Sequence, residues 1–232
     1  MKNFMQRELI KNINAINSSI NELCSSINRN KEEITLIAVS KKKNFKLIEI
    51  ALENGIYNFG ENYAQELEEK SSLINSTEIV WHFIGPVQSN KVKMISKNAD
   101  WIHTLDREKI IKKFNDECKK INKVINGCIQ VNISSEESKS GCSSDDLFDI
   151  AKLVESMENI KLKGIMALPK LTNDIEERDF MMSEVINLSC KLKKIYPEAD
   201  MVSLGTTSDF KDAIIHGSNM LRIGESIFGK RT

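Results

Sequence analysis

Lys41 is the residue of this 232-residue chain whose position most suggests chemistry. It follows the short apolar run from Leu36 to Ser40, whose β-branched content and polar borders are typical of a buried strand. A lysine there either presents an amine at the mouth of a site or belongs to a solvated charge run with Lys42 and Lys43. If the extended geometry persists, Lys41 and Lys43 share one face. The run alone does not decide between these interpretations.

Two segments near the C-terminus combine glycine with hydroxyl side chains. Residues 203–210 read Ser-Leu-Gly-Thr-Thr-Ser-Asp-Phe, and residues 222–226 read Arg-Ile-Gly-Glu-Ser. A phosphate needs hydroxyl donors and backbone amides that approach closely, and Gly205 and Gly224 carry no side chain to block that approach. Alternatively, the hydroxyl residues cap a helix and the glycines only turn the chain. Two adjacent segments of this kind would indicate a phosphate site.

The elements that would position these residues alternate along the chain. Apolar runs typical of strands end near Lys41, Gly60, Gly85, Asp106, Asn132, Leu168, Gly205 and Gly224. Segments of helical period lie between them, and a long apolar stripe over residues 9–27 precedes them. About eight strand-helix units predict one closed (β/α)₈ barrel, with an open doubly wound sheet as the alternative. We expect residues 1–30 to form an N-terminal helix packed on a barrel of residues 31–232, as one domain.

A closed barrel would bring the lysine and the two segments together. Its first and eighth strands are neighbours, and barrel sites lie at the carboxyl ends of strands, often with phosphate after strands seven and eight. Lys41 would then share a rim with Arg222 and Gly224. This arrangement suits pyridoxal phosphate, whose aldehyde forms an imine with a neutral lysine amine; burial and the charge of Lys43 would favour that neutral form. The alternative is a sugar- or nucleotide-phosphate enzyme in which Lys41 is a point charge.

Composition argues against several other classes of protein. Lysine plus arginine and aspartate plus glutamate both number 33, so no net field draws the chain to nucleic acid or acidic membranes. Five widely spaced cysteines predict free thiols in a reducing compartment. His82, His103 and His216 are far apart in sequence, and we expect packed or solvated histidines and no metal site. Without a signal peptide or an apolar run of about 18 residues, a soluble cytoplasmic protein is expected.

The motifs of the chain resemble those of the pyridoxal 5′-phosphate homeostasis proteins, the YggS/PROSC family, whose barrel is related to the N-terminal domain of alanine racemase. The resemblance runs from about Leu36 to the C-terminus. Its motifs are 38–41 Ala-Val-Ser-Lys, 59–63 Phe-Gly-Glu-Asn-Tyr, 81–86 Trp-His-Phe-Ile-Gly-Pro, 88–91 Gln-Ser-Asn-Lys, 130–133 Gln-Val-Asn-Ile, 139–141 Lys-Ser-Gly, 164–167 Gly-Ile-Met-Ala, both phosphate segments and 227–229 Ile-Phe-Gly.

The resemblance implies a type III pyridoxal-phosphate barrel in which seven residues contact the cofactor. They are Lys41, Asn62, Ser203, Thr207, Arg222, Gly224 and Glu225. Lys41 would carry the cofactor as a Schiff base, Asn62 would lie near the ring, and the phosphate would bind the two hydroxyl side chains and the backbone of residues 224–225. Arg222 would approach the pyridine nitrogen and leave it unprotonated, because a guanidinium stays charged, which weakens the ring as an electron sink.

The sequence departs from the family pattern in two places. The usual Ser-Met-Gly-Met-Ser is Ser-Leu-Gly-Thr-Thr at 203–207, which keeps a hydroxyl at Thr207, so we expect the phosphate contact to survive. The proline that commonly follows the cofactor lysine is replaced by Asn44-Phe45, which changes the loop more than the chemistry. Lys139, in the matching 139–141 stretch, is either a second site for cofactor handling or a surface lysine.

Two functions of different classes fit these residues. One is a carrier that holds pyridoxal phosphate on Lys41 without a reaction of its own and passes it to apo-enzymes. The other is an amino-acid racemase with Lys41 as one base. Alanine racemases supply the second base from a tyrosine of a further β-rich domain, whereas this chain ends at the barrel and none of Tyr57, Tyr63 and Tyr196 has a clear claim to that role, although Tyr63 follows the second strand. We therefore expect the carrier, as a monomer or weak dimer.

Overall fold

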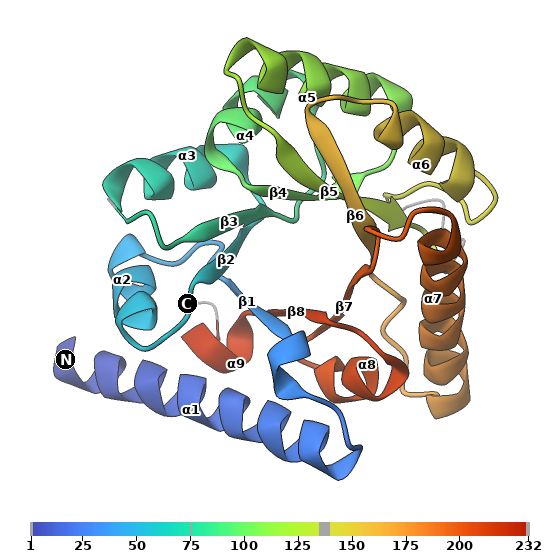
Figure 1. Cartoon of the computed structure of the whole chain (residues 1–232). Helices are drawn as coiled ribbons and strands as arrows, with labels where there is room; N and C mark the ends of the chain where they lie inside the picture. The colour runs from blue at the N-terminus through green and yellow to red at the C-terminus, as the bar shows by residue number, and fades with distance from the viewer. Residues whose placement is uncertain (1, 75, 135–139, 231–232) are drawn as a thin grey trace.

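The computed structural model describes residues 2–74, 76–134 and 140–230. Parallel strands run in chain order around a closed barrel, in which β8 pairs with β1 (Figure 1). The strands are β1 (Thr35–Val39), β2 (Asn58–Glu61), β3 (Val80–Phe83), β4 (Trp101–Leu105), β5 (Ile125–Val131), β6 (Ile160–Ala167), β7 (Met201–Thr206) and β8 (Met220–Ile223). The predicted (β/α)₈ barrel is confirmed, and the open sheet is excluded.

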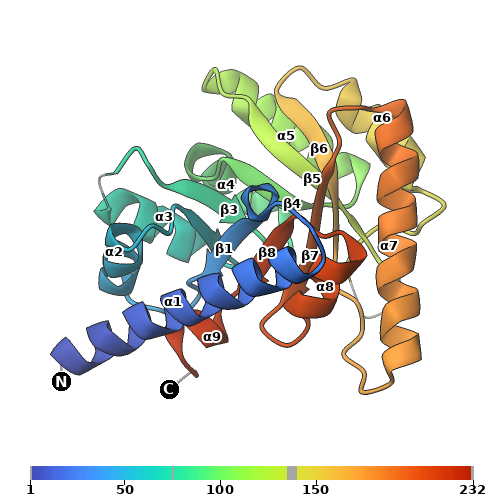
Figure 2. The ribbon, with the colours of Figure 1, turned by 60° about the horizontal axis from the view of Figure 1, so that its bottom comes forward.

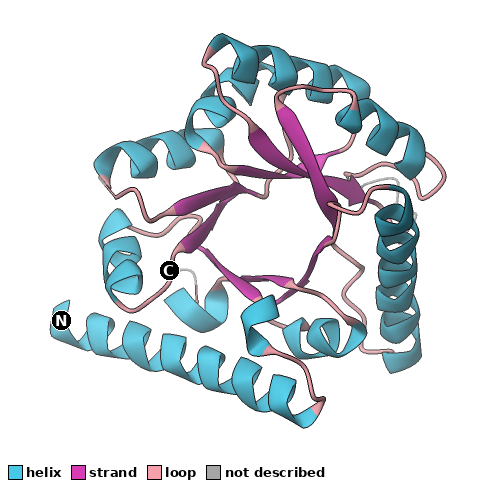
Figure 3. Ribbon diagram, in the orientation of Figure 1, coloured by secondary structure: helices cyan, strands magenta, loops and turns pink. Residues whose placement is uncertain are grey.

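Helices surround the strands (Figure 3), and buried apolar side chains from both form one core. The helices are α1 (Lys2–Ser26), α2 (Phe45–Glu53), α3 (Ala64–Leu73), α4 (Val92–Asn98), α5 (Glu108–Lys120), α6 (Leu147–Glu155), α7 (Ile175–Ile195), α8 (Phe210–His216) and α9 (Glu225–Phe228), with short 3-10 turns η1 (Lys31–Glu33) and η2 (Ser89–Lys91). In α5, Ile110, Phe114 and Cys118 are buried on one face because they recur every four residues. No helix within the described ranges is both long and apolar enough to cross a membrane.

The long first helix lies along the outside of the barrel, beside α2, α8 and α9 (Figure 2). Its apolar stripe is buried there, including Leu9, Ile13 and Ile20. At one point Asn12 donates a hydrogen bond of 3.1 Å from its side chain to the carbonyl oxygen of Ile227, at the opposite end of the sequence. The stripe therefore packs onto the body of the protein. A division of the chain at residue 30 stays a prediction.

Truncating this stripe should destabilise the protein. Ile13 is fully buried, so Ile13→Ala should lower the free energy of unfolding by about 2–5 kcal/mol, measured by urea denaturation. Ile27 lies just after the same helix and is 38% exposed, so Ile27→Ala is the matched control and should cost much less. Equal losses in the two variants would contradict the packing described here.

Candidate functional site

A cavity of about 470 Å³ opens at the carboxyl ends of the strands. Its volume is typical of small-molecule sites. Six of the seven predicted site residues line it: Lys41, Asn62, Thr207, Arg222, Gly224 and Glu225. The remaining wall is formed by Val39, Ile84, Leu168, Leu171, Thr206 and Ser208. The structure thus gathers a lysine, an arginine and the two glycine-bearing segments around one space.

Strand pairing explains why these residues meet. The register of β1 places Ile37 opposite Arg222 of β8, and Val39 opposite Gly60 of β2, so the ends of these strands share one rim. Gly224 lets β8 end close to β1, since a Cβ at this position would lie 3.1 Å from the carbonyl oxygen of Val39. The two segments that follow β7 and β8 reach the cavity from this side.

Gly205, near the end of β7, has a backbone conformation that suits glycine. Its φ is +96°, a region that L side chains rarely adopt, and a Cβ there would lie 2.6 Å from the Cβ of Ala213. The glycine therefore allows β7 to turn directly into α8. Thr206 then caps this turn, because its backbone N–H and its hydroxyl both bond to Asp209 Oδ1 at 2.7 Å.

Ser203 is the predicted residue that the structure places apart from the other six. It is fully buried in β7 and is not part of the cavity wall. Its hydroxyl accepts a hydrogen bond from Arg222 Nη1 and lies 2.8 Å from His103 Nδ1. Ser203 therefore lies beneath Arg222, and its phosphate contact stays a prediction.

Hydrogen bonds to buried groups of the barrel fix the position of the Arg222 guanidinium. Besides its bond to Ser203, it donates from Nη2 to the carbonyl oxygen of Ala167 at 2.9 Å. Only 4% of the residue is exposed, and burial lowers its pKa to about 10, so the guanidinium is still charged at neutral pH. These two bonds use two of the five N–H groups of the arginine, which also lines the cavity.

A line of hydrogen bonds continues from Arg222 across the barrel interior. His103 Nε2 lies 2.9 Å from His82 Nδ1, and His82 Nε2 lies 2.9 Å from Asn58 Oδ1. Arginine can only donate and a carbonyl oxygen can only accept, so the two ends fix the direction of every bond. The hydroxyl of Ser203 donates to His103 Nδ1, His103 Nε2–H to His82, and His82 Nε2–H to Asn58. We call these five residues the interior chain.

The interior chain requires both histidines to be neutral. Burial lowers the pKa of His82 to about 3. Burial also lowers the pKa of His103 well below its usual value, and repulsion from His82, were it protonated, and from the charged Arg222 acts in the same direction. The sequence predicted packed or solvated histidines but not their contact, because the two are separated by a full helical segment. The one feature of the sequence that could have indicated this contact is that the two histidines lie in consecutive predicted strands.

The expected face shared by Lys41 and Lys43 does not form, because β1 ends at Val39 and a turn follows. Lys43 Nζ donates to the carbonyl oxygens of Gly229 and Lys230, both at 3.1 Å, so this lysine anchors the chain after α9. Its effect on the protonation of Lys41 stays a prediction. Lys139 lies outside the described residues.

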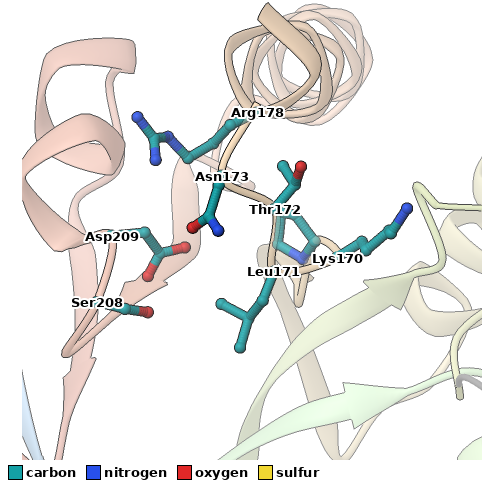
Figure 4. A pocket seen from close by; sticks show the side chains of 8 residues that line it. Lys170, Leu171, Thr172, Asn173, Arg178, Ser208 and Asp209 are labelled. Atoms are coloured by element: carbon teal, nitrogen blue, oxygen red, sulfur yellow. The ribbon is translucent and has the colours of Figure 1, made fainter. Parts of the chain in front are cut away.

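A second cavity of about 440 Å³ adjoins the first and shares Leu171 and Ser208 with it. Figure 4 shows Ser208 and Asp209 on one side of this space and the segment 170–173 on the other. Arg178 of α7 closes its far end and pairs with Asp212 of α8, with 3.0 Å between Nε and Oδ2. The segment between β6 and α7 therefore forms a wall common to both cavities.

Comparisons with known proteins agree with this geometry. A family model for the alanine racemase N-terminal domain matches residues 12–232. The pyridoxal phosphate homeostasis protein of Haemophilus influenzae is 41% identical over 95% of this chain and 94% of its own. The protein of that name from Escherichia coli K12 is 37% identical over 97% of both chains. The chain belongs to the pyridoxal phosphate homeostasis protein family.

Two solved structures extend the comparison to three-dimensional structure. PipY of Synechococcus elongatus PCC7942, solved with pyridoxal phosphate bound, is 25% identical with a TM-score of 0.78 over 90% of this chain and 100% of its own. Alanine racemase from Clostridium difficile is 15% identical with a TM-score of 0.79, over 97% of this chain and 57% of its own. The racemase therefore shares the fold with this chain.

The neutral histidines of this family member make its stability depend on pH. The pKa of each is lower in the folded state than in the unfolded state, so the unfolded chain binds more protons below about pH 6.5. The free energy of unfolding should therefore fall between about pH 6.5 and 5, by up to about 1.4 kcal/mol per pH unit for each histidine. Urea denaturation across this range measures the slope.

Two variants separate this effect from the titration of other groups. His82→Gln removes one of the two buried histidines and should make the slope shallower. His216→Gln is the control, because His216 lies outside the interior chain, with Nδ1 2.8 Å from the carbonyl oxygen of Asp212. An unchanged slope in His82→Gln would show that the histidine titrates in the folded protein much as it does in the unfolded chain.

Proposed function

We propose that this protein holds pyridoxal phosphate reversibly on Lys41 and serves intracellular homeostasis of this cofactor, without a reaction of its own. The observation that carries the proposal is that the amine-bearing Lys41, the charged Arg222 and the two glycine-bearing segments line one cavity. The cofactor supplies an aldehyde, which bonds reversibly to a neutral primary amine. The names of the relatives and the ligand of PipY support this assignment.

The residues of the cavity fit the parts of this cofactor. Thr207 offers a hydroxyl and residues 224–225 offer backbone amides at the rim, as a phosphate requires. Arg222 would bind the ring nitrogen while the interior chain keeps its guanidinium in place. Asn62 Oδ1 is buried and has no hydrogen-bond partner among the described residues, so a donor on the ligand would satisfy it. Ser203 supports Arg222 through its hydroxyl, and its contact with the phosphate stays a prediction.

The cavity favours a carrier over an amino-acid racemase. Racemisation requires acid-base groups on both faces of the substrate. Besides Lys41, the described residues of this wall include no tyrosine, histidine or cysteine, and their one carboxylate is Glu225, whose backbone amide the proposal assigns to the phosphate. Tyr63 is 49% exposed and lies outside the wall. A charged arginine at the ring nitrogen would also keep the ring a weak electron sink. These features oppose a reaction that needs a stabilised carbanion.

Chemical trapping tests the role of Lys41. Purified protein mixed with pyridoxal phosphate should gain visible absorbance, and borohydride reduction followed by peptide mass mapping should place the adduct on Lys41. Lys41→Ala should abolish both signals, whereas Lys42→Ala, which changes the exposed neighbouring lysine, should retain them. An adduct confined to another lysine, or no chromophore in the wild type, would refute the proposal.

Loss of chirality tests the choice between carrier and racemase. The loaded protein is incubated with single enantiomers of many amino acids, and the mirror image is measured by chiral chromatography. We expect no conversion above the rate of free pyridoxal phosphate. Conversion by the wild type that disappears in Lys41→Ala would instead establish the racemase.

Three further statements belong to the same proposal. The protein works in the cytoplasm, it passes its cofactor to apo-enzymes that depend on pyridoxal phosphate, and it is a monomer or weak dimer. Reactivation of such an apo-enzyme by the loaded protein, at a rate above that expected from free cofactor, measures the transfer. Light scattering during size-exclusion chromatography gives the oligomeric state.

A further inference from the structure

Lys41 lies in a tight turn just after β1, and the end of the strand does not by itself explain this turn. The backbone N–H of Lys43 donates to the carbonyl oxygen of Ser40 at 3.0 Å, which places Lys41 and Lys42 at the centre of the turn. Lys42 has a φ of +60°, in the left-handed region that residues other than glycine and asparagine rarely adopt. Such a turn persists only where its surroundings hold it.

One ion pair of α3 holds both peptide groups that flank Lys41. On one side, Lys70 Nζ donates to the carbonyl oxygen of Ser40 at 2.7 Å. On the other side, the backbone N–H of Lys42 donates to Glu66 Oε2 at 2.6 Å. Lys70 and Glu66 bond to each other at 2.9 Å, because a spacing of four residues places them on one face of the helix. The two contacts therefore act as one clamp.

The clamp is anchored in the protein interior. Glu61 of β2 is fully buried, and its Oε1 accepts hydrogen bonds from Lys70 at 2.7 Å and from the Ser40 hydroxyl at 2.6 Å. Burial raises the pKa of Glu61, while the charge of Lys70 opposes that rise. Burial also acts to raise the pKa of Glu66, but its bonds to Lys70 and to the Lys42 amide outweigh this, so its pKa is lowered. Glu66 is thus ionised at neutral pH.

We propose that Glu66 and Lys70 are positioning residues for Lys41, fixing the turn that presents its amine to the cavity. An amine held in place forms a bond to an aldehyde without first losing the freedom of a mobile loop. The two residues lie outside the cavity wall, so they act through the backbone and not by touching a ligand. Pyridoxal phosphate as the aldehyde rests on the proposed function, whereas the clamp itself does not.

Amide hydrogen exchange tests the clamp in the protein without any ligand. Glu66→Ala should speed exchange of the Lys42 amide by roughly tenfold, since it removes a hydrogen bond to a charged acceptor. Glu66→Gln should stay close to the wild type, because its side-chain oxygen can still accept that bond. Glu108→Ala is the matched control, because it removes the same Glu-Lys pairing at an exposed place on α5. Exchange in Glu66→Ala equal to that of the wild type would overturn the proposal.

Loading with pyridoxal phosphate tests whether the clamp serves Lys41. The rate at which borohydride traps an adduct on Lys41 should fall severalfold in Glu66→Ala and recover in Glu66→Gln, with all variants first shown to be folded by denaturant unfolding. A merely structural role would lower stability without this selective recovery. Loading of Glu66→Ala at the wild-type rate would overturn the positioning role. If the wild type forms no adduct at all, the proposed function fails, and the exchange experiment still decides whether the clamp exists.

Discussion

The pairing of β8 with β1 is the constraint on which the rest of the site depends. Residues near both ends of the sequence meet only because this pairing closes the sheet, with Ala38 opposite Ile223. Lys41, in the turn that follows β1, and Arg222 of β8 then line one cavity. The contact is close because Gly224 has no side chain to separate the strands. The tertiary fold, and not a local sequence motif, therefore brings the amine, the guanidinium and the rim segments together.

The barrel interior beneath this rim departs from the usual apolar filling of such folds. Buried polar groups are costly unless each finds a partner, and the interior chain meets that demand with every donor matched to an acceptor. Its hydrogen bonds run, donor to acceptor, from the charged Arg222 to the amide oxygen of Asn58. A neutral, ordered chain thus supports one buried cation without introducing a second charge. Arg222 connects the two regions, because it belongs to the interior chain and also lines the cavity at the rim.

Much of the fold and of the cavity could be predicted from the sequence, because both depend on patterns that repeat along the chain. Alternating strand and helix segments indicate a barrel, and closure alone makes Lys41 and Arg222 neighbours. The place of Ser203 could not be predicted in this way, because the register of β7 against β8 shifts between Ser203 and Thr206 and changes which residues face the rim. The turn at Lys42 could not be predicted from the apolar run, because side-chain contacts from α3 stabilise the reversal.

The closing of the barrel also sets when binding becomes possible during synthesis. A ribosome makes the chain in the direction from N- to C-terminus, so the segment with Lys41 emerges long before Arg222 and Gly224. Until β8 has joined β1, the nascent chain displays a lysine without the rest of its cavity. A reactive aldehyde would meet only an ordinary amine at that stage. Affinity would then arise in one late step, together with the completed barrel.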